Sequence, residues 1–274
     1  MTDIKQAFHG KTVIITGGSS GLGAALAREF ARMGANTALF SPDGPNLEAV
    51  AAECRELGAP GALAVVGDAT VPDDCRRLVD ETVAAFGGVD YLIANAGVSM
   101  WERFDEVRDL GVFKRIMDIN YLGTVHCVHF ALPHLRKTKG MIAATVSIQG
   151  EIPVPLHTGY VASKHAVLGF LNTLRMEIAD SGVDILAVLP HWLRGTNLRA
   201  AAFRGDGNVV GEGTKKHNKE SISVDDASRA IIDAIAKRKR RLVIPAKLRP
   251  LPALFRIWPG LVEKLVGNAV SKQK

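Results

Sequence analysis

The sequence predicts a doubly wound α/β fold, in which helices cover both faces of a parallel β-sheet. Three observations support this fold class. Short apolar runs rich in β-branched residues alternate with stretches of helical period along most of the 274 residues. The runs are apolar at successive positions, as expected of strands that are buried on both faces. A glycine-rich turn joins the first run to the first helix, as in the opening unit of a doubly wound sheet.

The stretch 11–23, which reads KTVIITGGSSGLG, begins this pattern. Thr12–Thr16 is predicted to be a buried strand, and Gly17, Gly21 and Gly23 follow it. A helix opens inside the glycine run, because apolar residues recur at helical period at positions 22, 26, 30 and 33. Such a turn places backbone N–H groups and the positive end of a helix against a diphosphate, and a Cβ atom would block the approach. An ordinary glycine-rich turn is the alternative that this stretch alone leaves open.

Further strands are predicted at short apolar runs that end at turn residues such as glycine, asparagine or proline. Their ranges are 37–40, 63–66, 91–94, 141–146, 184–189 and 241–244. Gly17–Gly23, Asp68–Thr70, Asn95–Gly97, Ser147 and Pro190 each follow a strand. Because parallel strands point the same way, we expect these residues to converge on one crevice at the carboxyl end of the sheet.

Helices are predicted between the strands. One follows the glycine turn, and others cover 47–57, 72–86, 157–180 and 225–237. A long helical region covers about 103–137, and we expect interruptions near Asn120 and Pro133. The polar stretch 198–223 has little apolar period and is predicted to be a loop. Since no repeat or linker divides the chain, we expect one domain over 1–245 and a tail over 246–274.

Composition and charge exclude several classes of protein. Hydrophobic residues make up 47% of the chain and charged residues 23%, as in a globular protein. Cys54, Cys75 and Cys127 form no paired motif, so we expect free thiols in a reducing compartment and no bound metal. The net charge of +6 is uneven, because 237–274 carries 11 Lys and Arg residues against one acid, which leaves −4 for the rest. The domain therefore lacks the basic character of a nucleic-acid-binding protein.

The first ten residues lack an apolar core, and no apolar run is long enough to span a membrane. On this basis we expect a cytoplasmic protein.

Tyr160 and Lys164 lie four residues apart on a predicted helix, so their side chains share one face. We expect the Lys164 ammonium to lower the pKa of Tyr160, which would make the phenol a proton donor or acceptor near neutral pH. Ser147, just after a strand, could hold a substrate oxygen that gains or loses charge. Asn120, within a helical region, could interrupt the helix and bind water beside the lysine as part of a proton relay.

Together these motifs make the chain similar to the short-chain dehydrogenase/reductase family over residues 11–244, in the family's shorter form. Thr16-Gly17-x-x-x-Gly21-x-Gly23 matches its cofactor motif, Asn95-Ala96-Gly97 its NAG motif, and Tyr160-x-x-x-Lys164 its catalytic pair. Ser147 is 13 residues before Tyr160 and Asn120 is 27 before Ser147, as the family's catalytic tetrad is spaced. The resemblance implies a Rossmann-like sheet of about seven strands and an NAD(P)-dependent alcohol dehydrogenase or carbonyl reductase.

In such an enzyme each member of the tetrad has a role. Tyr160 would be the general acid or base, and Lys164 would bind the nicotinamide ribose and lower the tyrosine pKa. Ser147 would polarise the carbonyl group, and Asn120 would shape the proton relay. The nicotinamide itself carries the hydride.

The resemblance also implies which residues contact the cofactor. We expect these to be Gly17, Ser19, Ser20, Gly21, Leu22, Gly23, Ser41, Asp68, Ala69, Asn95, Ala96, Gly97, Tyr160, Lys164, Pro190 and Leu193. Family members read the adenosine ribose by an acid at the position of Ser41 for NAD, or an arginine at the position of Pro42 for NADP. This chain has neither. Ser41 would tolerate a 2′-phosphate whereas Asp43 would oppose one, so the choice stays open, with Ser41 favouring NADP.

Candidate walls of the substrate pocket are Val98–Trp101, Gln149–His157 and His191–Leu193. They are mostly apolar and hold no cluster of Arg or Lys that would bind a phosphate or carboxylate. We therefore expect a small hydrophobic alcohol or ketone that is steroid-like, lipid-like or aromatic. His191 stands where the family has glycine and is either structural or catalytic. The segment 196–223 is either a lid over the pocket or a plain surface loop.

The tail mixes basic residues with Leu, Phe and Trp, and Pro250, Pro252 and Pro259 divide it into short pieces. It could lie on an anionic membrane surface, fold over the pocket or pack on a partner subunit. The tail and the length of the C-terminus resemble the branch of the family that acts on steroids and long-chain keto-lipids. The family also implies a homodimer or homotetramer.

Two other classes of function stay open. One is a non-catalytic nucleotide-binding sensor or scaffold, which would not need Ser147, Tyr160 and Lys164 together. The other is a membrane-surface adaptor that uses the tail alone.

Overall fold

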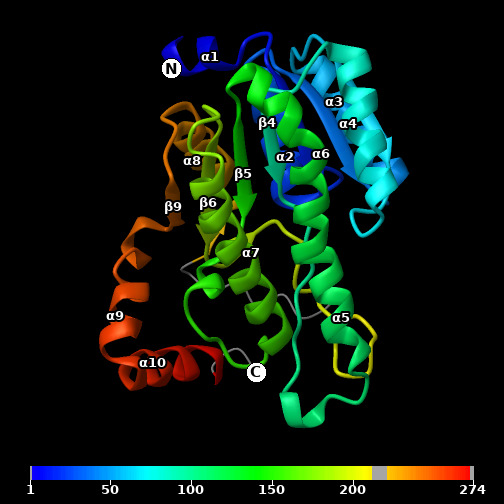
Figure 1. Cartoon of the computed structure of the whole chain (residues 1–274). Coiled ribbons are helices and arrows are strands. Elements are labelled where there is room, and N and C mark those ends of the chain that lie inside the picture. The colour runs from blue at the N-terminus through cyan, green and yellow to red at the C-terminus, as the bar shows by residue number, and fades with distance from the viewer. Residues whose placement is uncertain (1, 212–220, 272–274) are drawn as a thin grey trace.

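The computed structural model describes residues 2–211 and 221–271, and the predicted α/β fold is confirmed (Figure 1). Seven strands form one parallel sheet in the order β3-β2-β1-β4-β5-β6-β9. Their bounds are β1 (Thr12–Thr16), β2 (Asn36–Ser41), β3 (Ala62–Val66), β4 (Tyr91–Ala94), β5 (Met141–Thr145), β6 (Asp184–Pro190) and β9 (Arg241–Ile244). The order reverses at β1, so the carboxyl ends of β1 and β4 flank the crevice in which such sheets bind ligands.

Helices cover both faces of this sheet and bury two apolar cores. The helices over one face are α2 (Gly21–Arg32), α3 (Gly44–Glu56) and α8 (Val224–Ala236), and those over the other are α4 (Pro72–Phe86), α6 (Gly123–Thr138) and α7 (Thr158–Glu177). Side chains of a strand alternate between the two faces, so the neighbours Ile14 and Ile15 of β1 belong to different cores. A strand that is apolar at successive positions is therefore buried on both sides, as the sequence predicts.

The long helical region before β5 is divided at one of the two predicted places. α5 (Gly111–Met117) leads into a π-helical turn, Asp118–Leu122, which is followed by α6. The predicted interruption at Pro133 is wrong, because α6 continues through it. Pro133 is exposed while its neighbours Ala131 and Leu135 are fully buried, so packing holds the helix on both sides of the missing N–H.

Other boundaries differ from prediction by a few residues. α3 begins at Gly44 rather than residue 47, because the Asp43 side chain accepts a hydrogen bond from Asn46 N and caps the helix. The stretch 103–110 contains only a short 3₁₀ turn, Phe104–Glu106. A helix that the sequence did not suggest, α1 (Thr2–Phe8), places Phe8 edge-on to Phe30 at 5.2 Å between ring centres.

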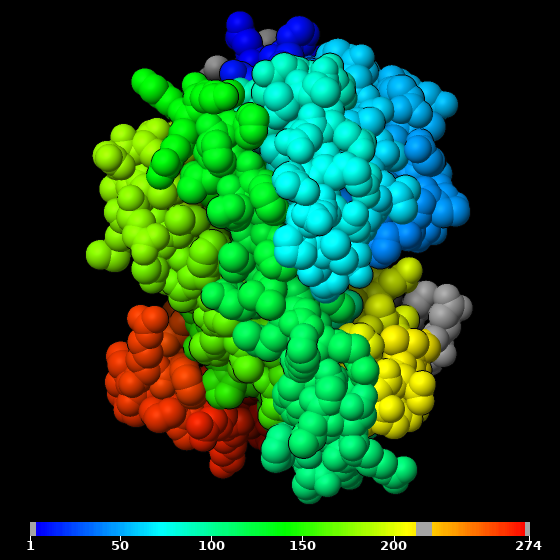
Figure 2. Space-filling model, turned by 45° about the vertical axis from the view of Figure 1, so that its right-hand side comes forward, coloured from blue at the N-terminus to red at the C-terminus, as the bar shows by residue number. Residues whose placement is uncertain are grey.

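The C-terminal segment continues from β9 as a 3₁₀ turn followed by α9 (Leu251–Ile257) and α10 (Pro259–Ser271). Figure 2 shows these helices at the same end of the molecule as the segment around residue 200 and the region of α5. Leu248, Leu251, Phe255 and Val266 pack against the core formed with α4, α6 and α7. Within the described parts of the chain, no helix is long and apolar enough to cross a membrane.

Candidate active site

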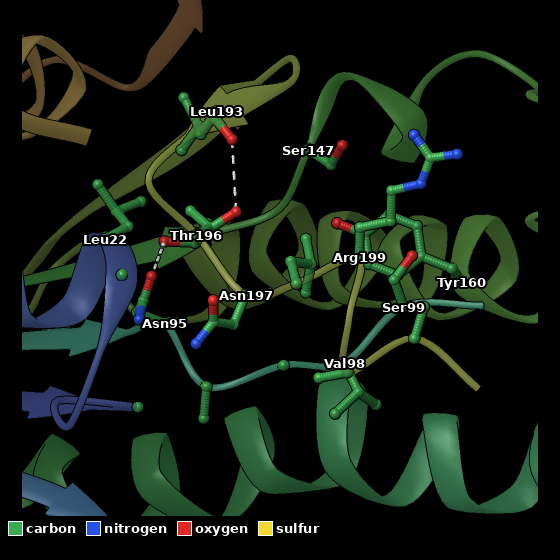
Figure 3. Close-up of a pocket in the computed structure, with 18 of the residues that line it drawn as sticks. Leu22, Asn95, Val98, Ser99, Ser147, Tyr160, Leu193, Thr196, Asn197 and Arg199 are labelled. Carbon is green, nitrogen blue, oxygen red and sulfur yellow. Dashed lines mark hydrogen bonds between the residues drawn. The ribbon is translucent and has the colours of Figure 1, made fainter. Parts of the chain in front are cut away.

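A cavity of about 450 Å³ opens at the carboxyl ends of the strands (Figure 3). The residues that follow β1, β2, β3, β4, β5 and β6 all contribute to its lining, as the sequence predicts for this edge of the sheet. Of the predicted catalytic and cofactor-contacting residues, the lining includes Gly17, Ser19, Ser20, Gly21, Leu22, Ser41, Asp68, Ala69, Asn95, Ala96, Gly97, Ser147, Tyr160, Lys164, Pro190 and Leu193. Gly23 and Asn120 are not among the residues that line it.

The glycine turn is shaped by close contacts. Gly17 and Gly21 have φ of +65° and +53°, a region that side chains with a Cβ rarely adopt. A Cβ at Gly23 would lie 2.1 Å from the carbonyl oxygen of Gly17, so only glycine lets α2 begin so close to the turn. Gly23 thus acts by shaping the turn rather than by lining the cavity.

Hydrogen bonds tie this turn to the next two strands. Thr16 Oγ1 accepts from Asn95 N at 2.9 Å and from Ala96 N at 3.0 Å, and Asn95 Nδ2 donates to Thr16 O at 3.1 Å. Thr145 Oγ1 donates to Asn95 Oδ1 at 3.1 Å. The ends of β1, β4 and β5 are therefore held in register. The backbone N–H groups after β1, the start of α2 and this fixed floor suit the diphosphate and ribose of a dinucleotide.

At the adenosine end the two serine hydroxyls lie together. Ser19 Oγ is 3.0 Å from Ser41 Oγ, and Ser41 Oγ accepts a hydrogen bond from Asp43 N. The Asp43 carboxylate turns to Asn46, whose Nδ2 donates to Oδ2 at 2.7 Å. Asp43 does not line the cavity.

Ser147, Tyr160 and Lys164 meet in the middle of the cavity. Lys164 Nζ donates to Thr145 O at 2.9 Å and lies 5.7 Å from the centre of the Tyr160 ring. Burial lowers the pKa of Lys164 to about 8. Burial also raises the pKa of Tyr160 to about 12, and the Ser147 hydroxyl offsets this only in part. The pKa of Tyr160 therefore lies above its ordinary value rather than below it as expected, because burial disfavours the phenolate.

Ser147 has an unusual backbone. Its φ of 134° and ψ of 154° lie in a region that is essentially restricted to glycine. The side chain accepts from Gln149 N at 3.2 Å and donates to Pro190 O at 3.4 Å, so the 3₁₀ turn Ile148–Gly150 and the end of β6 both hold it. Backbone strain of this kind persists only where the surrounding structure holds the residue in place. Here it fixes the orientation of the Ser147 hydroxyl in the cavity.

Asn120 occupies the π-helical turn and is fully buried. Its Oδ1 accepts from Val98 N at 2.8 Å, and its Nδ2 donates to Val98 O and to Ser163 Oγ, each at 2.9 Å. The side chain therefore holds the strand end after β4 against α7. The sequence predicted the helix interruption at this residue, whereas these protein contacts occupy the amide that we expected to bind water.

The substrate end of the cavity is aromatic. Ring centres of Trp101 and His157 are 5.0 Å apart, those of Trp101 and Trp192 are 6.1 Å apart, and those of His157 and Tyr160 are 6.3 Å apart. Burial lowers the pKa of His157 to about 4, so it is neutral near pH 7. Its Nδ1 donates to Pro155 O at 2.7 Å, because a carbonyl oxygen can only accept. All three predicted wall segments contribute residues to the lining, and His191 is one of them.

Sequence reasoning missed one functional candidate, Arg199. It lines the cavity, and its guanidinium carbon lies 4.1 Å from the centre of the Trp101 ring. Arg199 belongs to the polar stretch after β6, whose path no periodicity indicates. Phe203 fixes that path, since its O accepts from Trp101 N and its N donates to Ser99 O, both at 2.9 Å.

The segment expected to be a lid or a loop is described only in part. Residues 196–202, 211 and 221 line the cavity. This position is consistent with a segment that covers the cavity. Residues 212–220 of the same prediction lie outside the described part of the chain.

No group of His, Cys, Asp or Glu among residues 2–211 and 221–271 is arranged to hold a metal ion. Cys54, Cys75 and Cys127 are free and buried.

Comparisons with known proteins agree with this architecture. The family model described as short chain dehydrogenase matches residues 11–206. From Arabidopsis thaliana, the protein named 11-beta-hydroxysteroid dehydrogenase-like 4A is 36% identical over 260 residues, which cover 94% of this chain and 84% of the relative. Another, named 11-beta-hydroxysteroid dehydrogenase 1A, is 34% identical over 266 residues, covering 96% of this chain and 76% of the relative.

Two solved structures share the fold. A short chain dehydrogenase/reductase from Burkholderia phymatum in complex with NAD has a TM-score of 0.81 at 24% identity, covering 93% of this chain and 95% of that one. An alcohol dehydrogenase from Thermococcus sibiricus complexed with 5-hydroxy-NADP has a TM-score of 0.75 at 24% identity, covering 85% and 95%. At this identity the likeness concerns the fold.

Proposed function

The chain belongs to the short-chain dehydrogenase family, and on that premise we propose that it transfers a hydride between NAD(P)(H) and a hydrophobic secondary alcohol or ketone. One observation carries the proposal. Ser147, Tyr160 and Lys164 line the same cavity as the glycine turn after β1, so a bound dinucleotide and a carbonyl substrate would meet at Tyr160. The aromatic walls at the other end favour an apolar substrate, and the names of the plant relatives point the same way.

When bound, the nicotinamide supplies or accepts the hydride. The chain's own groups provide the proton and the orientation. Tyr160, with a pKa raised to about 12, is a neutral phenol that can donate its proton to a carbonyl oxygen. The strained Ser147 holds its hydroxyl toward the same oxygen, and Lys164 places a positive charge beside the phenol to stabilise the phenolate that remains. Asn120 positions the strand end after β4 and α7, which carry the cavity wall and Tyr160.

Of the two nucleotides, we propose NADP. No acid stands at the position of Ser41, the Ser19 and Ser41 hydroxyls lie together there, and the Asp43 carboxylate is hydrogen-bonded to Asn46 and does not line the cavity. An acid that bonds the ribose hydroxyls is what usually selects NAD.

The test is a titration of the purified protein with NADPH and with NADH, followed by nicotinamide fluorescence. We expect binding of both and tighter binding of NADPH. Tyr160→Phe should bind cofactor as the wild type does, yet lose at least about a hundredfold in turnover, since it lacks the proton donor. If neither nucleotide binds at sub-millimolar concentration, the oxidoreductase proposal fails. If both bind but no ketone or alcohol is turned over, the sensor or scaffold function takes its place.

We further propose that the C-terminal segment touches a membrane surface. Ile257, Trp258, Leu261 and Leu265 are exposed, and Arg256 and Lys264 lie exposed among them. Apolar side chains flanked by basic ones suit an interface of anionic lipid, where a lipid-like substrate would be found.

We also propose that the chain forms a homodimer or homotetramer, as the family implies. Size-exclusion chromatography with light scattering would test this.

A further inference from the structure

The cavity holds one cation that the proposed reaction does not use. Arg199 lies at the substrate end, over Trp101. Lys164, the other Lys or Arg among the described lining residues, is engaged at Tyr160 and Thr145. In Figure 3, Arg199 and Tyr160 both lie on the side of the view away from Leu22 and Asn95, which are at the cofactor end. A positive charge therefore stands where the far part of a substrate would lie.

No acid of the described chain compensates this charge within the cavity. The Nε atom of Arg199 is buried and has no hydrogen-bond partner among residues 2–211 and 221–271. Glu102, which shares a smaller adjoining hollow with it, accepts instead from Gly205 N at 3.3 Å. Asp68, the acidic residue among those that line the cavity in this part of the chain, follows β3 at the opposite end. A buried donor without a partner is costly, and an acceptor on a ligand would relieve that cost.

We propose that Arg199 binds a carboxylate of the substrate, so that the substrate is a hydrophobic alcohol or ketone with an acidic group at its far end. This inference rests on the proposed function and names the substrate class more closely. Arg199 lies outside the three wall segments that the sequence predicted, in which no cluster of Arg or Lys was found.

The geometry suits a carboxylate. A guanidinium is planar and can bind both carboxylate oxygens at once, and the contact of its central carbon with the Trp101 ring helps to hold the group in place. Ring contacts run from Tyr160 through His157 to Trp101, which provides an apolar path between the reacting carbonyl and the arginine. Because His157 is neutral, Arg199 is the charge that an anion meets there. A phosphate dianion would call for a second cation, which the described lining offers only at Lys164.

The test compares keto acids with their methyl esters, because each pair shares an apolar body and differs in charge. The probes are 4-acetylbenzoate, which is short and rigid, and 9-oxodecanoate, which is long and flexible. Protein saturated with the oxidised form of the nucleotide that it binds cannot reduce a ketone, so calorimetry measures binding without turnover. A hydrogen bond to a charged group contributes about 1.5–3 kcal/mol, so we expect at least one acid to bind about ten- to a hundredfold tighter than its ester.

Variants then assign the preference to Arg199. Arg199→Met should bind the acid about ten- to a hundredfold more weakly and the ester within about twofold of the wild type. Arg199→Lys keeps the charge without the planar fork and should be intermediate. Arg194→Met is the matched control, because Arg194 is exposed on the nearby strand β7 (Leu193–Arg194) and does not line the cavity. Unchanged binding of the nucleotide shows that each variant is folded.

Equal acid-to-ester ratios in the wild type and Arg199→Met would overturn the inference, and so would a wild type that binds no acid more tightly than its ester. The proposed function is tested separately, with the reduced nucleotide and the same ketones. Arg199-dependent binding of the acid without any hydride transfer would refute the oxidoreductase and leave the carboxylate site standing.

Discussion

Burial decides the charge state of the key side chains. Tyr160, Lys164 and His157 are 6%, 4% and 1% exposed, and in each burial shifts the pKa in the direction that destabilises the charged form. In the proposed reaction Tyr160 would thus donate its proton as a neutral phenol, beside a lysine that remains mostly charged near pH 7. Sequence spacing places Tyr160 and Lys164 on one face of a helix, but it does not report how much water surrounds them.

The buried His157 should make stability depend on pH. Its pKa falls from 6.5 to about 4 on folding, so between these values the unfolded chain binds the extra proton. The stabilisation is complete above pH 6.5 and is lost as the pH falls toward 4. Between pH 7 and pH 5 the loss from this group is about 2 kcal/mol in the free energy of unfolding.

Urea unfolding of His157→Gln should show a pH dependence that is smaller by this amount. His165→Gln is the matched control, because His165 is exposed on the same helix α7, and it should keep the wild-type dependence. If the free energy of unfolding depended on pH equally in the wild type and in His157→Gln, His157 would have an ordinary pKa in the folded protein.

The sequence predicts the position of a site residue only where a local pattern, such as a strand end or a helical period, fixes that position. The tetrad and the glycine turn follow strands whose ends meet by topology, so their convergence could be inferred. Arg199 could not, because its position depends on how 197–211 pairs with 99–109 through Phe203, Trp101 and Gly205. Such long-range pairing of an irregular segment has no periodic signal. The pKa of Tyr160 was missed for a related reason, since burial is a property of the packed cavity.

Among the elements, the turn between β1 and α2 is the most constrained. Gly23→Ala would place a Cβ 2.1 Å from Gly17 O and 2.8 Å from Asn95 Nδ2, so backbone must shift at the dinucleotide site. We expect the free energy of unfolding to fall by about 1–3 kcal/mol and NADPH affinity to fall with it. Thermal unfolding and nicotinamide fluorescence measure the two effects.

Gly267→Ala in α10 provides the contrast, because a Cβ there would meet nothing within 4 Å. An alanine in open helix interior should raise stability by about 0.5–1 kcal/mol and leave nucleotide binding unchanged. A Gly23→Ala protein that binds NADPH as well as Gly267→Ala does would refute the steric account of the turn.

Helix boundaries show where local rules fail. Pro72 begins α4 as predicted, because the first turn needs no backbone N–H. Pro133 does not end α6, since Ala131 and Leu135 pack against the core around it. The same residue type thus has opposite outcomes, and burial of its neighbours, which the sequence does not state, decides between them.

At the scale of the whole molecule, the C-terminal segment is both part of the fold and a surface. Leu248, Leu251, Phe255 and Val266 pack on the core, and Val262 is fully buried. Deleting residues 247–274 would therefore uncover apolar core surface and could not isolate membrane binding. Substituting exposed side chains of α10 and its start leaves that packing in place.

Trp258→Ser with Leu261→Ser is the variant that this arrangement suggests, because the two side chains are 59% and 49% exposed. We expect the wild type to sediment with vesicles that contain phosphatidylserine, less so at high salt, and the double variant to lose most of this binding. Leu110→Ser, which alters an even more exposed apolar residue (69%) beside α5, should bind as the wild type does. Since Arg256, Lys264, Ile257 and Leu265 remain in the double variant, any binding that it keeps comes from these charges and the two remaining apolar side chains, and its loss at high salt measures the electrostatic share. The proposed membrane contact would be contradicted by a wild type that does not bind the vesicles, or by a double variant that binds them as well as the wild type does. The exposed apolar patch would then be a candidate site for a protein partner.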